Sequence, residues 1–213
     1  MIIDVFQDTI CPWCRVGKRN LQKALEQVDE EVEVHYRSFF LYYNTPKEGM
    51  SLKEYMNLKG IEEKEKFLVP IRVIAQNAGF DFDLYEHKKV PNTILSHQLT
   101  KIVPEELQQQ LLDKIHFGYF DNDDDIGDID VLCRYAKELG LDDQDIRNRL
   151  LNEEGKDIVM GEYKSGLLLG VRGVPFFVIN QKVGVNGAQS PQKLLAAIKF
   201  AQEKESQSAT QNS

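Results

Sequence analysis

The chain lacks the features that would place it in several large functional classes. In 213 residues, no apolar run approaches the roughly 18 residues that a membrane-spanning helix needs. Lysine and arginine total 26 against 34 acidic residues, and a net charge of −8 disfavours binding to nucleic-acid phosphates. The N-terminus shows no basic segment followed by an apolar stretch and a cleavage site. We therefore expect a cytoplasmic protein that binds neither membranes nor nucleic acid.

Cysteine is also scarce, and its three positions are Cys11, Cys14 and Cys133. Structural disulfides are rare in a reducing compartment, so a close pair of cysteines there is more often catalytic or metal-binding. A structural zinc site needs four ligands, and the chain has no second Cys-x-x-Cys. We therefore expect no metal. Cys133 falls on an amphipathic segment and is expected to be a buried small apolar residue.

The hydrophobic pattern predicts strands at both ends of the chain and helices between them. Residues 2–6 are almost wholly apolar, as in a buried strand, and a helix from Pro12 to about Val28 follows. Residues 32–40 alternate as a second strand, and 175–179 with 183–185 predict a short hairpin before a last helix from 191 to about 203. This order predicts an α/β thioredoxin-like fold, β-α-β … β-β-α, interrupted by an all-helical insertion.

The same pattern sets the expected domain boundaries. Residues 1–42 and 170–204 should form the thioredoxin-like core, and residues 43–169 the helical insertion domain. No flexible linker separates the two, so the insertion should pack over the sheet as a lid. The polar residues 205–213 are expected to form a disordered tail.

The sequence Cys11-Pro12-Trp13-Cys14 stands where the first strand gives way to the first helix. Free N–H groups and the helix dipole at that point favour a thiolate, which is the nucleophile in disulfide exchange. We predict that Cys11 is the more exposed, attacking thiol and that Cys14 resolves the mixed disulfide. Pro12 stiffens the turn, and Trp13 offers an apolar surface to a substrate. A zinc half-site and two inert core thiols are the alternatives.

A second signal is Pro175, which stands at the start of a predicted strand, where proline is otherwise awkward. A tight bend that faces the cysteine pair would suit a cis bond between Val174 and Pro175. In that arrangement the backbone of Val174 could pair with an extended substrate. An ordinary trans proline on an edge strand is the alternative.

Together these segments resemble the DsbA-type thiol oxidoreductases, most closely the FrnE-like branch, which is related to 2-hydroxychromene-2-carboxylate isomerases and kappa-class glutathione transferases. The resemblance implies a thioredoxin fold with a helical insertion, a redox pair of Cys11 and Cys14, and a cis Pro175. The matching segments occur in the family's order along the chain: Asp8 to Cys14 with Gly17-Lys18, Asn92-Thr93 with His97, Gly173 to Phe177, and Asn186 to Gln189.

Asn92 and His97 have two possible roles. They could bind substrate in the cleft opposite Cys11, or they could be a helix cap and a packed core side chain. The proton acceptor for Cys14 is equally open, because the pleat of the first strand decides whether Asp4 or Asp8 faces the pair.

The sequence therefore predicts a protein dithiol–disulfide oxidoreductase or isomerase. Its expected partners are protein or low-molecular-weight thiols and disulfides, and its cofactor is none beyond the Cys11–Cys14 disulfide, with glutathione as a candidate co-substrate. One alternative is a glutathione-dependent transferase or isomerase that acts on a small aromatic molecule. Another is a chaperone-like module that binds unfolded clients. The direction of electron flow stays open, as does the choice between monomer and homodimer.

Overall fold

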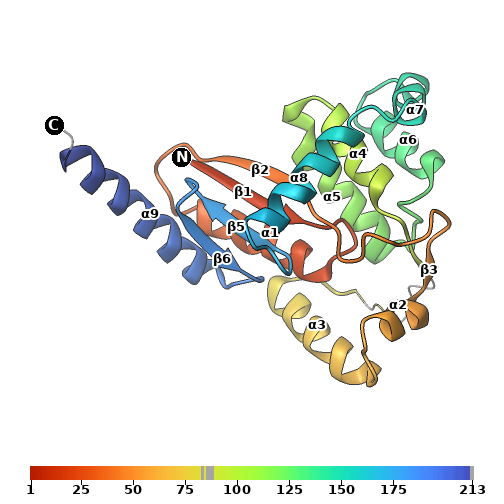
Figure 1. Cartoon of the computed structure of the whole chain (residues 1–213), viewed down its shortest axis with the longest axis horizontal. Helices are drawn as coiled ribbons and strands as arrows, with labels where there is room; N and C mark the ends of the chain where they lie inside the picture. The colour runs from red at the N-terminus through yellow and green to blue at the C-terminus, as the bar shows by residue number, and fades with distance from the viewer. Residues whose placement is uncertain (83, 85–88, 212–213) are drawn as a thin grey trace.

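A four-stranded sheet with helices on both faces forms one end of the molecule, and a block of helices forms the other (Figure 1). The computed structural model describes residues 1–82, 84 and 89–211. The strands β1 (Ile2–Gln7), β2 (Glu33–Ser38), β5 (Phe176–Ile179) and β6 (Val183–Asn186) lie in the order β2-β1-β5-β6. β1 runs parallel to β2 and antiparallel to β5, so the N-terminal strand is central.

Two helices cover one face of this sheet. Strand side chains alternate between faces, and Ile3 and Val5 of β1 point to the face that α1 (Pro12–Leu25) and α9 (Pro191–Gln211) cover. The apolar side chains that fill this layer also include Leu21, Phe177, Ile179, Leu194 and Ile198. On the opposite face, α8 (Lys156–Leu168) packs closely, because a Cβ at Gly166 would lie 3.0 Å from Phe6 and Phe39.

The segment between the two halves of the sheet forms most of a second apolar core, to which Ile10 and Val16 also contribute. Leu99, Leu111, Ile115, Leu132 and Ile146 are among its fully buried side chains. Its remaining elements are β3 (Met50–Ser51), α2 (Leu52–Leu58), α3 (Lys64–Ala78), β4 (Lys89–Val90), α4 (Ile94–Ile102), α5 (Glu105–Asp121), α6 (Ile129–Glu138) and α7 (Asp143–Leu151).

The expected thioredoxin-like order of elements is confirmed, with two corrections. The insertion is not wholly helical, because β3 and β4 pair as a short antiparallel sheet whose two-residue strands are too short to show alternation in the sequence. The last helix continues to Gln211, so residues 205–211 are helical and not a tail without structure. The chain after Pro191 has neither glycine nor another proline to end a helix. Residues 212–213 lie outside the described residues, and the domain boundaries stay a prediction.

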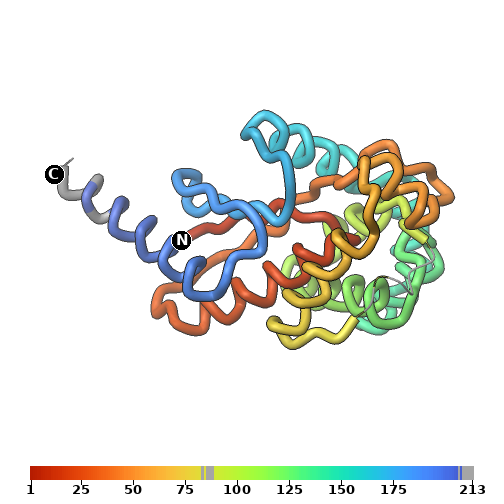
Figure 2. The backbone as a smooth tube through the Cα atoms, turned by 90° about the horizontal axis from the view of Figure 1, so that it is seen from below, coloured from red at the N-terminus to blue at the C-terminus, as the bar shows by residue number. Residues whose placement is uncertain are grey.

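α9 projects beyond the sheet and extends away from the helical block (Figure 2). Among the described residues, no helix has the length and apolar character needed to cross a membrane.

Candidate active site

The two cysteines meet at the first turn of α1, as predicted. Cys11 is the N-cap residue with an extended backbone, and Pro12 occupies the first helical position. The amide of Cys14 donates to the Cys11 carbonyl at 3.0 Å, and the amide of Cys11 donates to the Asp8 carbonyl at 3.0 Å. Both thiols are reduced. The sequence therefore places two thiols one helical turn apart, at the helix end where the dipole favours an anion.

The exposure of the thiols differs from the prediction. Cys11 is 1% exposed and Cys14 is 2% exposed, so the expectation that Cys11 is the more accessible thiol was wrong. Phe39, Val171 and Val174 pack in the same apolar cluster as the two thiols, and the half-buried Trp13 packs against it. A substrate disulfide can reach Cys11 only when part of this apolar cover moves aside.

The bend before β5 lies directly against the pair. The Val174–Pro175 peptide bond is cis, as predicted. The thiol of Cys11 donates to the Val174 carbonyl, with 3.5 Å between Sγ and the oxygen. The ring of Pro175 rests on α1, since a Cβ at Gly17 would lie 2.7 Å from its Cγ. Gly17 is therefore needed for the bend and the helix to approach each other this closely.

A Gly17→Ala substitution tests this close approach. We expect the added methyl group to push the Pro175 bend away from α1 and to lower the free energy of unfolding by about 1–3 kcal/mol, the usual range for overpacking. The matched control is Gly161→Ala in α8, because nothing lies within 4 Å of a Cβ at that position. The control should stabilise the protein by about 0.5–1 kcal/mol. Urea unfolding of both variants measures the difference, and equal effects would contradict the account.

One buried carboxylate, that of Asp8, lies next to the cysteine pair. Asp8 is 1% exposed, and its Oδ2 accepts a hydrogen bond of 2.7 Å from the amide of Leu41. Its Oδ1 has no hydrogen-bond partner among the described residues and lies 3.4 Å from Nε2 of His97. Asp4, the other candidate, is engaged instead by Arg37 at 2.6 Å. The pleat of β1 therefore directs Asp4 away from the pair, and Asp8 is the acid next to it.

The second thiol holds its proton strongly. Burial raises the pKa of Cys14 well above its ordinary value, and the hydrogen bond and charge of Cys11 add to this effect. The backbone of Asp8 opposes the increase, whereas the charge of its carboxylate adds to it. Cys14 is thus a thiol at neutral pH and needs a proton acceptor before it can act as a nucleophile.

Two of the residues predicted to bind substrate, Asn92 and His97, make other contacts. His97 is fully buried between Asp8 and the ring of Phe40, whose centroid is 5.3 Å away, as the alternative of a packed core side chain expects, and its substrate-binding role stays a prediction. The side chain of Asn92 donates to the Thr45 carbonyl at 2.6 Å and accepts from the amide of Ile94 at 3.0 Å. Asn92 therefore connects a loop to the start of α4 and is not brought to the thiols.

The cations that follow the pair on α1 are neutralised. Arg15 lies 2.6 Å from Asp121 and stacks 4.2 Å from the ring centroid of Phe80. Lys18 lies 2.5 Å from Asp113, and burial lowers the pKa of this lysine. Neither side chain leaves an uncompensated positive charge beside the thiols, and Trp13 supplies none.

Sequence reasoning missed one buried histidine near the site. His116 is buried, with both ring nitrogens lacking a hydrogen-bond partner among the described residues. Burial lowers its pKa well below the ordinary value, and nearby Lys18, Arg15 and His97 contribute to this. Its position inside a helical segment gave no signal in the sequence. Cys133 is buried in α6, as expected, and burial raises its pKa.

Comparisons with known proteins identify a matching family and several structural relatives. A family model described as a DSBA-like thioredoxin domain matches residues 2–199. The uncharacterized protein YwbO of Bacillus subtilis is 26% identical over 204 residues, which cover 95% of this chain and 98% of that protein. A probable DsbA oxidoreductase from Streptomyces coelicolor has 27% identity and a TM-score of 0.87, covering 95% of this chain and 90% of its own. The cytosolic disulfide reductase DsbM of Pseudomonas aeruginosa shares the fold at 17% identity, with a TM-score of 0.67 and coverage of 99% and 100%.

Proposed function

The chain belongs to the family of DSBA-like thioredoxin domains, and from this premise we propose that it exchanges disulfides with its substrates through Cys11 and Cys14. The observation that carries the proposal is the position of both reduced thiols in the first turn of α1, with the Val174 carbonyl 3.5 Å from Cys11 Sγ. Thiols in this position form a dithiol that can close to a disulfide and reopen.

In the reducing direction, the Cys11 thiolate attacks one sulfur of a substrate disulfide. A bond forms between Cys11 Sγ and that sulfur, and the other substrate sulfur leaves as a thiolate that takes up a proton. The helix dipole at the start of α1 stabilises the attacking thiolate. The substrate is then held as a mixed disulfide through Cys11.

In the second step, Cys14 resolves the mixed disulfide. Its proton passes to the carboxylate of Asp8, and Cys14 Sγ attacks Cys11 Sγ while the substrate thiolate departs. The protein ends with a Cys11–Cys14 disulfide, and two electrons have moved to the substrate. Oxidation of a substrate dithiol is the same sequence in reverse.

This chemistry needs no cofactor beyond the cysteine pair, and the substrates are protein or low-molecular-weight disulfides and thiols. Glutathione is a candidate co-substrate that could return the pair to its starting state. We place the activity in the cytoplasm, where one close cysteine pair in a cysteine-poor chain is typical of redox enzymes.

Trapping of the mixed disulfide tests the proposal. A Cys14→Ser variant incubated with a model disulfide, such as native insulin with its disulfides intact, should accumulate a covalent adduct through Cys11, because the resolving thiol is gone. Non-reducing electrophoresis and peptide mass spectrometry identify the adduct and its cysteine. Cys133→Ala is the control, because it removes a buried thiol outside the pair and should accumulate no adduct. If Cys14→Ser forms no adduct, or forms it through Cys133, the proposed function is wrong.

A further inference from the structure

A pocket of about 520 Å³ opens beside the redox pair, between the end of β2, the end of α2 and the bend before β5. Its size is within the range of ligand sites in proteins. Its lining combines aromatic and aliphatic side chains with backbone and with two cations: Phe39, Phe40, Leu41, Lys59, Leu167, Gly170, Val171, Arg172 and Gly173. We call this the cationic pocket.

The cationic pocket adjoins the active site. Phe39 and Val171 line the pocket and also belong to the apolar cluster that packs around Cys11 and Cys14. Gly173 immediately precedes Val174, whose carbonyl accepts a hydrogen bond from the Cys11 thiol. A molecule whose sulfur approaches Cys11 along this bend therefore has its neighbouring groups at the pocket.

Two cations at this pocket lack an acidic partner. Arg172 is exposed and makes no hydrogen bond or ion pair with the residues that the structure describes. Lys59 donates to the carbonyl of Leu41 and lies 5.6 Å from the ring centroid of Tyr42, but it forms no ion pair within the same described part of the chain. By contrast, Arg15 and Lys18 on α1 each pair with an aspartate.

We propose that the cationic pocket receives an acidic segment of a polypeptide substrate, with a carboxylate close to the cysteine that Cys11 attacks. This inference rests on the proposed function and names the substrate class of the same site. Charge complementarity supports the proposal: the chain carries a net charge of −8, yet the described residues that line this pocket include two cations without an acidic partner and no carboxylate.

The chain geometry limits where the carboxylate lies. Arg172 is two residues before Val174, so their Cα atoms are at most about 7 Å apart. An extended substrate advances about 3.3 Å per residue, which puts the acidic side chain within about two or three positions of its cysteine. The apolar walls at Phe39 and Leu167 suit a large apolar residue in the same segment.

The test uses three peptides that share one intramolecular disulfide and differ only beside it, with glutamate, glutamine or lysine two residues from one cysteine. The wild-type protein should reduce the glutamate peptide with about a tenfold higher kcat/KM than the lysine peptide, mainly through KM. A K59E/R172E double variant should reverse that preference. High salt should weaken the preference in both proteins, because part of the attraction is exposed to solvent.

The control is a K182E/K193E variant, which makes the same change in net charge at exposed lysines outside the pocket and should keep the wild-type preference. Equal rates for all three peptides in the wild-type protein would overturn the inference while leaving the proposed function intact. A K59E/R172E variant that reduces oxidised glutathione more slowly than the wild-type protein, while both proteins treat the three peptides alike, would overturn it too. The occupant of the pocket would then be a small disulfide. If the wild-type protein reduces none of the peptides, the proposed function itself fails.

Discussion

Replacement of Asp8 by asparagine should slow the resolution of the mixed disulfide by about two orders of magnitude or more, the range found for the loss of a positioned general base. The reason lies in the state of Cys14, whose pKa burial and the neighbouring Cys11 raise well above the ordinary value. Asp8 is the buried carboxylate next to this thiol, and its Oδ1 has no hydrogen-bond partner among the described residues. Asparagine keeps the shape and can still accept from the Leu41 amide, so the change removes chiefly the proton acceptor.

Rapid-mixing measurements of substrate release from a preformed mixed disulfide isolate this step. The rate of the Asp8→Asn variant should rise with pH, since hydroxide replaces the missing acceptor and the thiol of Cys14 ionises at high pH. Asp4→Asn is the matched control on the same strand, because Asp4 pairs with Arg37 and not with the thiols. An Asp8→Asn variant that releases substrate as fast as the wild-type protein at pH 7 would exclude Asp8 as the acceptor.

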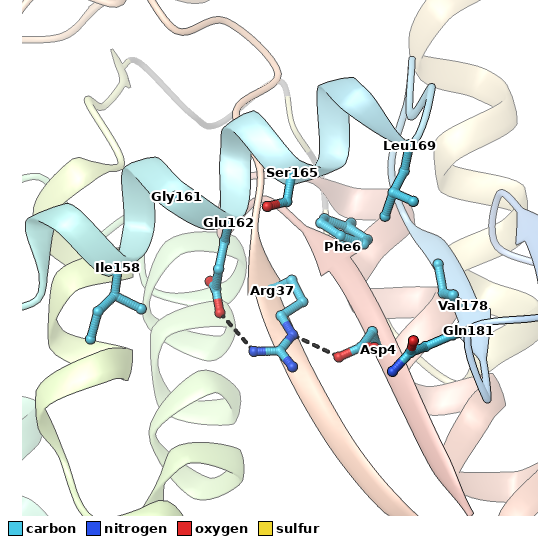
Figure 3. Close-up of a pocket in the computed structure, with 10 residues that line it drawn as sticks. All are labelled: Asp4, Phe6, Arg37, Ile158, Gly161, Glu162, Ser165, Leu169, Val178 and Gln181. Carbon is cyan, nitrogen blue, oxygen red and sulfur yellow. Dashed lines mark hydrogen bonds and ion pairs between the residues drawn. The ribbon is translucent and has the colours of Figure 1, made fainter.

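The largest effect on stability is expected at Glu162 of α8, which joins this helix to the sheet (Figure 3). Its carboxylate accepts from the amide of Ser38 at 2.7 Å, from Lys101 at 2.8 Å and from Arg37 at 3.2 Å. The side chains of Glu162 and Lys101 are 10% and 9% exposed. A Glu162→Ala variant leaves the Ser38 amide without its acceptor and the buried Lys101 ammonium without its counter-charge, with only the Tyr36 carbonyl at 2.6 Å still accepting from it, and should lose about 3–5 kcal/mol of unfolding free energy.

The control and the pH dependence separate this network from an ordinary surface pair. Glu138→Ala breaks an exposed pair with Lys114 and should change the unfolding free energy by less than about 1 kcal/mol.

Burial opposes the ionisation of Glu162, but Lys101, the Ser38 amide and Arg37 outweigh it, and the pKa of Glu162 is lowered. Its contribution is therefore complete above the unfolded value of about 4.3 and is lost as the pH falls through the lower folded value. Urea unfolding at pH 7 and in acid measures both effects, and equal losses for the two variants would contradict them.

The parts of the site that the sequence predicts are those that local chemistry determines. The turn from β1 to α1 brings Cys11 and Cys14 together, and the bend at Pro175 follows from a proline at the start of a strand beside them. What covers the thiols was not predictable, because Phe39 and Val171 are far apart in the chain and meet only through the packing of α8 on the sheet.

The choice between Asp4 and Asp8 depended in the same way on tertiary structure, since the register of β1 against β2 sets which acid faces Arg37. The surroundings of His97 could not be predicted because a histidine on an apolar helix face can point either to a cleft or into the core. Lys59 and Arg172 had no signal at all, since they are 113 positions apart in the sequence and share a pocket only in the fold.

The charges on α1 and at Asp8 lead us to expect one direction of electron flow. A strong oxidant owes its high potential to a stabilised thiolate in the reduced form. Here Arg15 and Lys18 are paired with aspartates, and Trp13 adds no charge. The carboxylate of Asp8 lies next to the thiols, and its negative charge acts on Cys14. These groups add no net positive charge beside the thiols, and we therefore expect the pair to act as a reductant although the cationic pocket beside it carries Lys59 and Arg172.

The equilibrium redox potential of the Cys11–Cys14 pair tests the central claim most directly. Alkylation of free thiols across graded redox buffers, read by mass spectrometry, reports the fraction of disulfide at each poise. The account predicts one two-electron transition that is lost in Cys11→Ser, with a potential closer to the value of about −270 mV known for thioredoxin than to about −120 mV for a strong oxidant. The absence of a Cys11–Cys14 disulfide at every poise would contradict it.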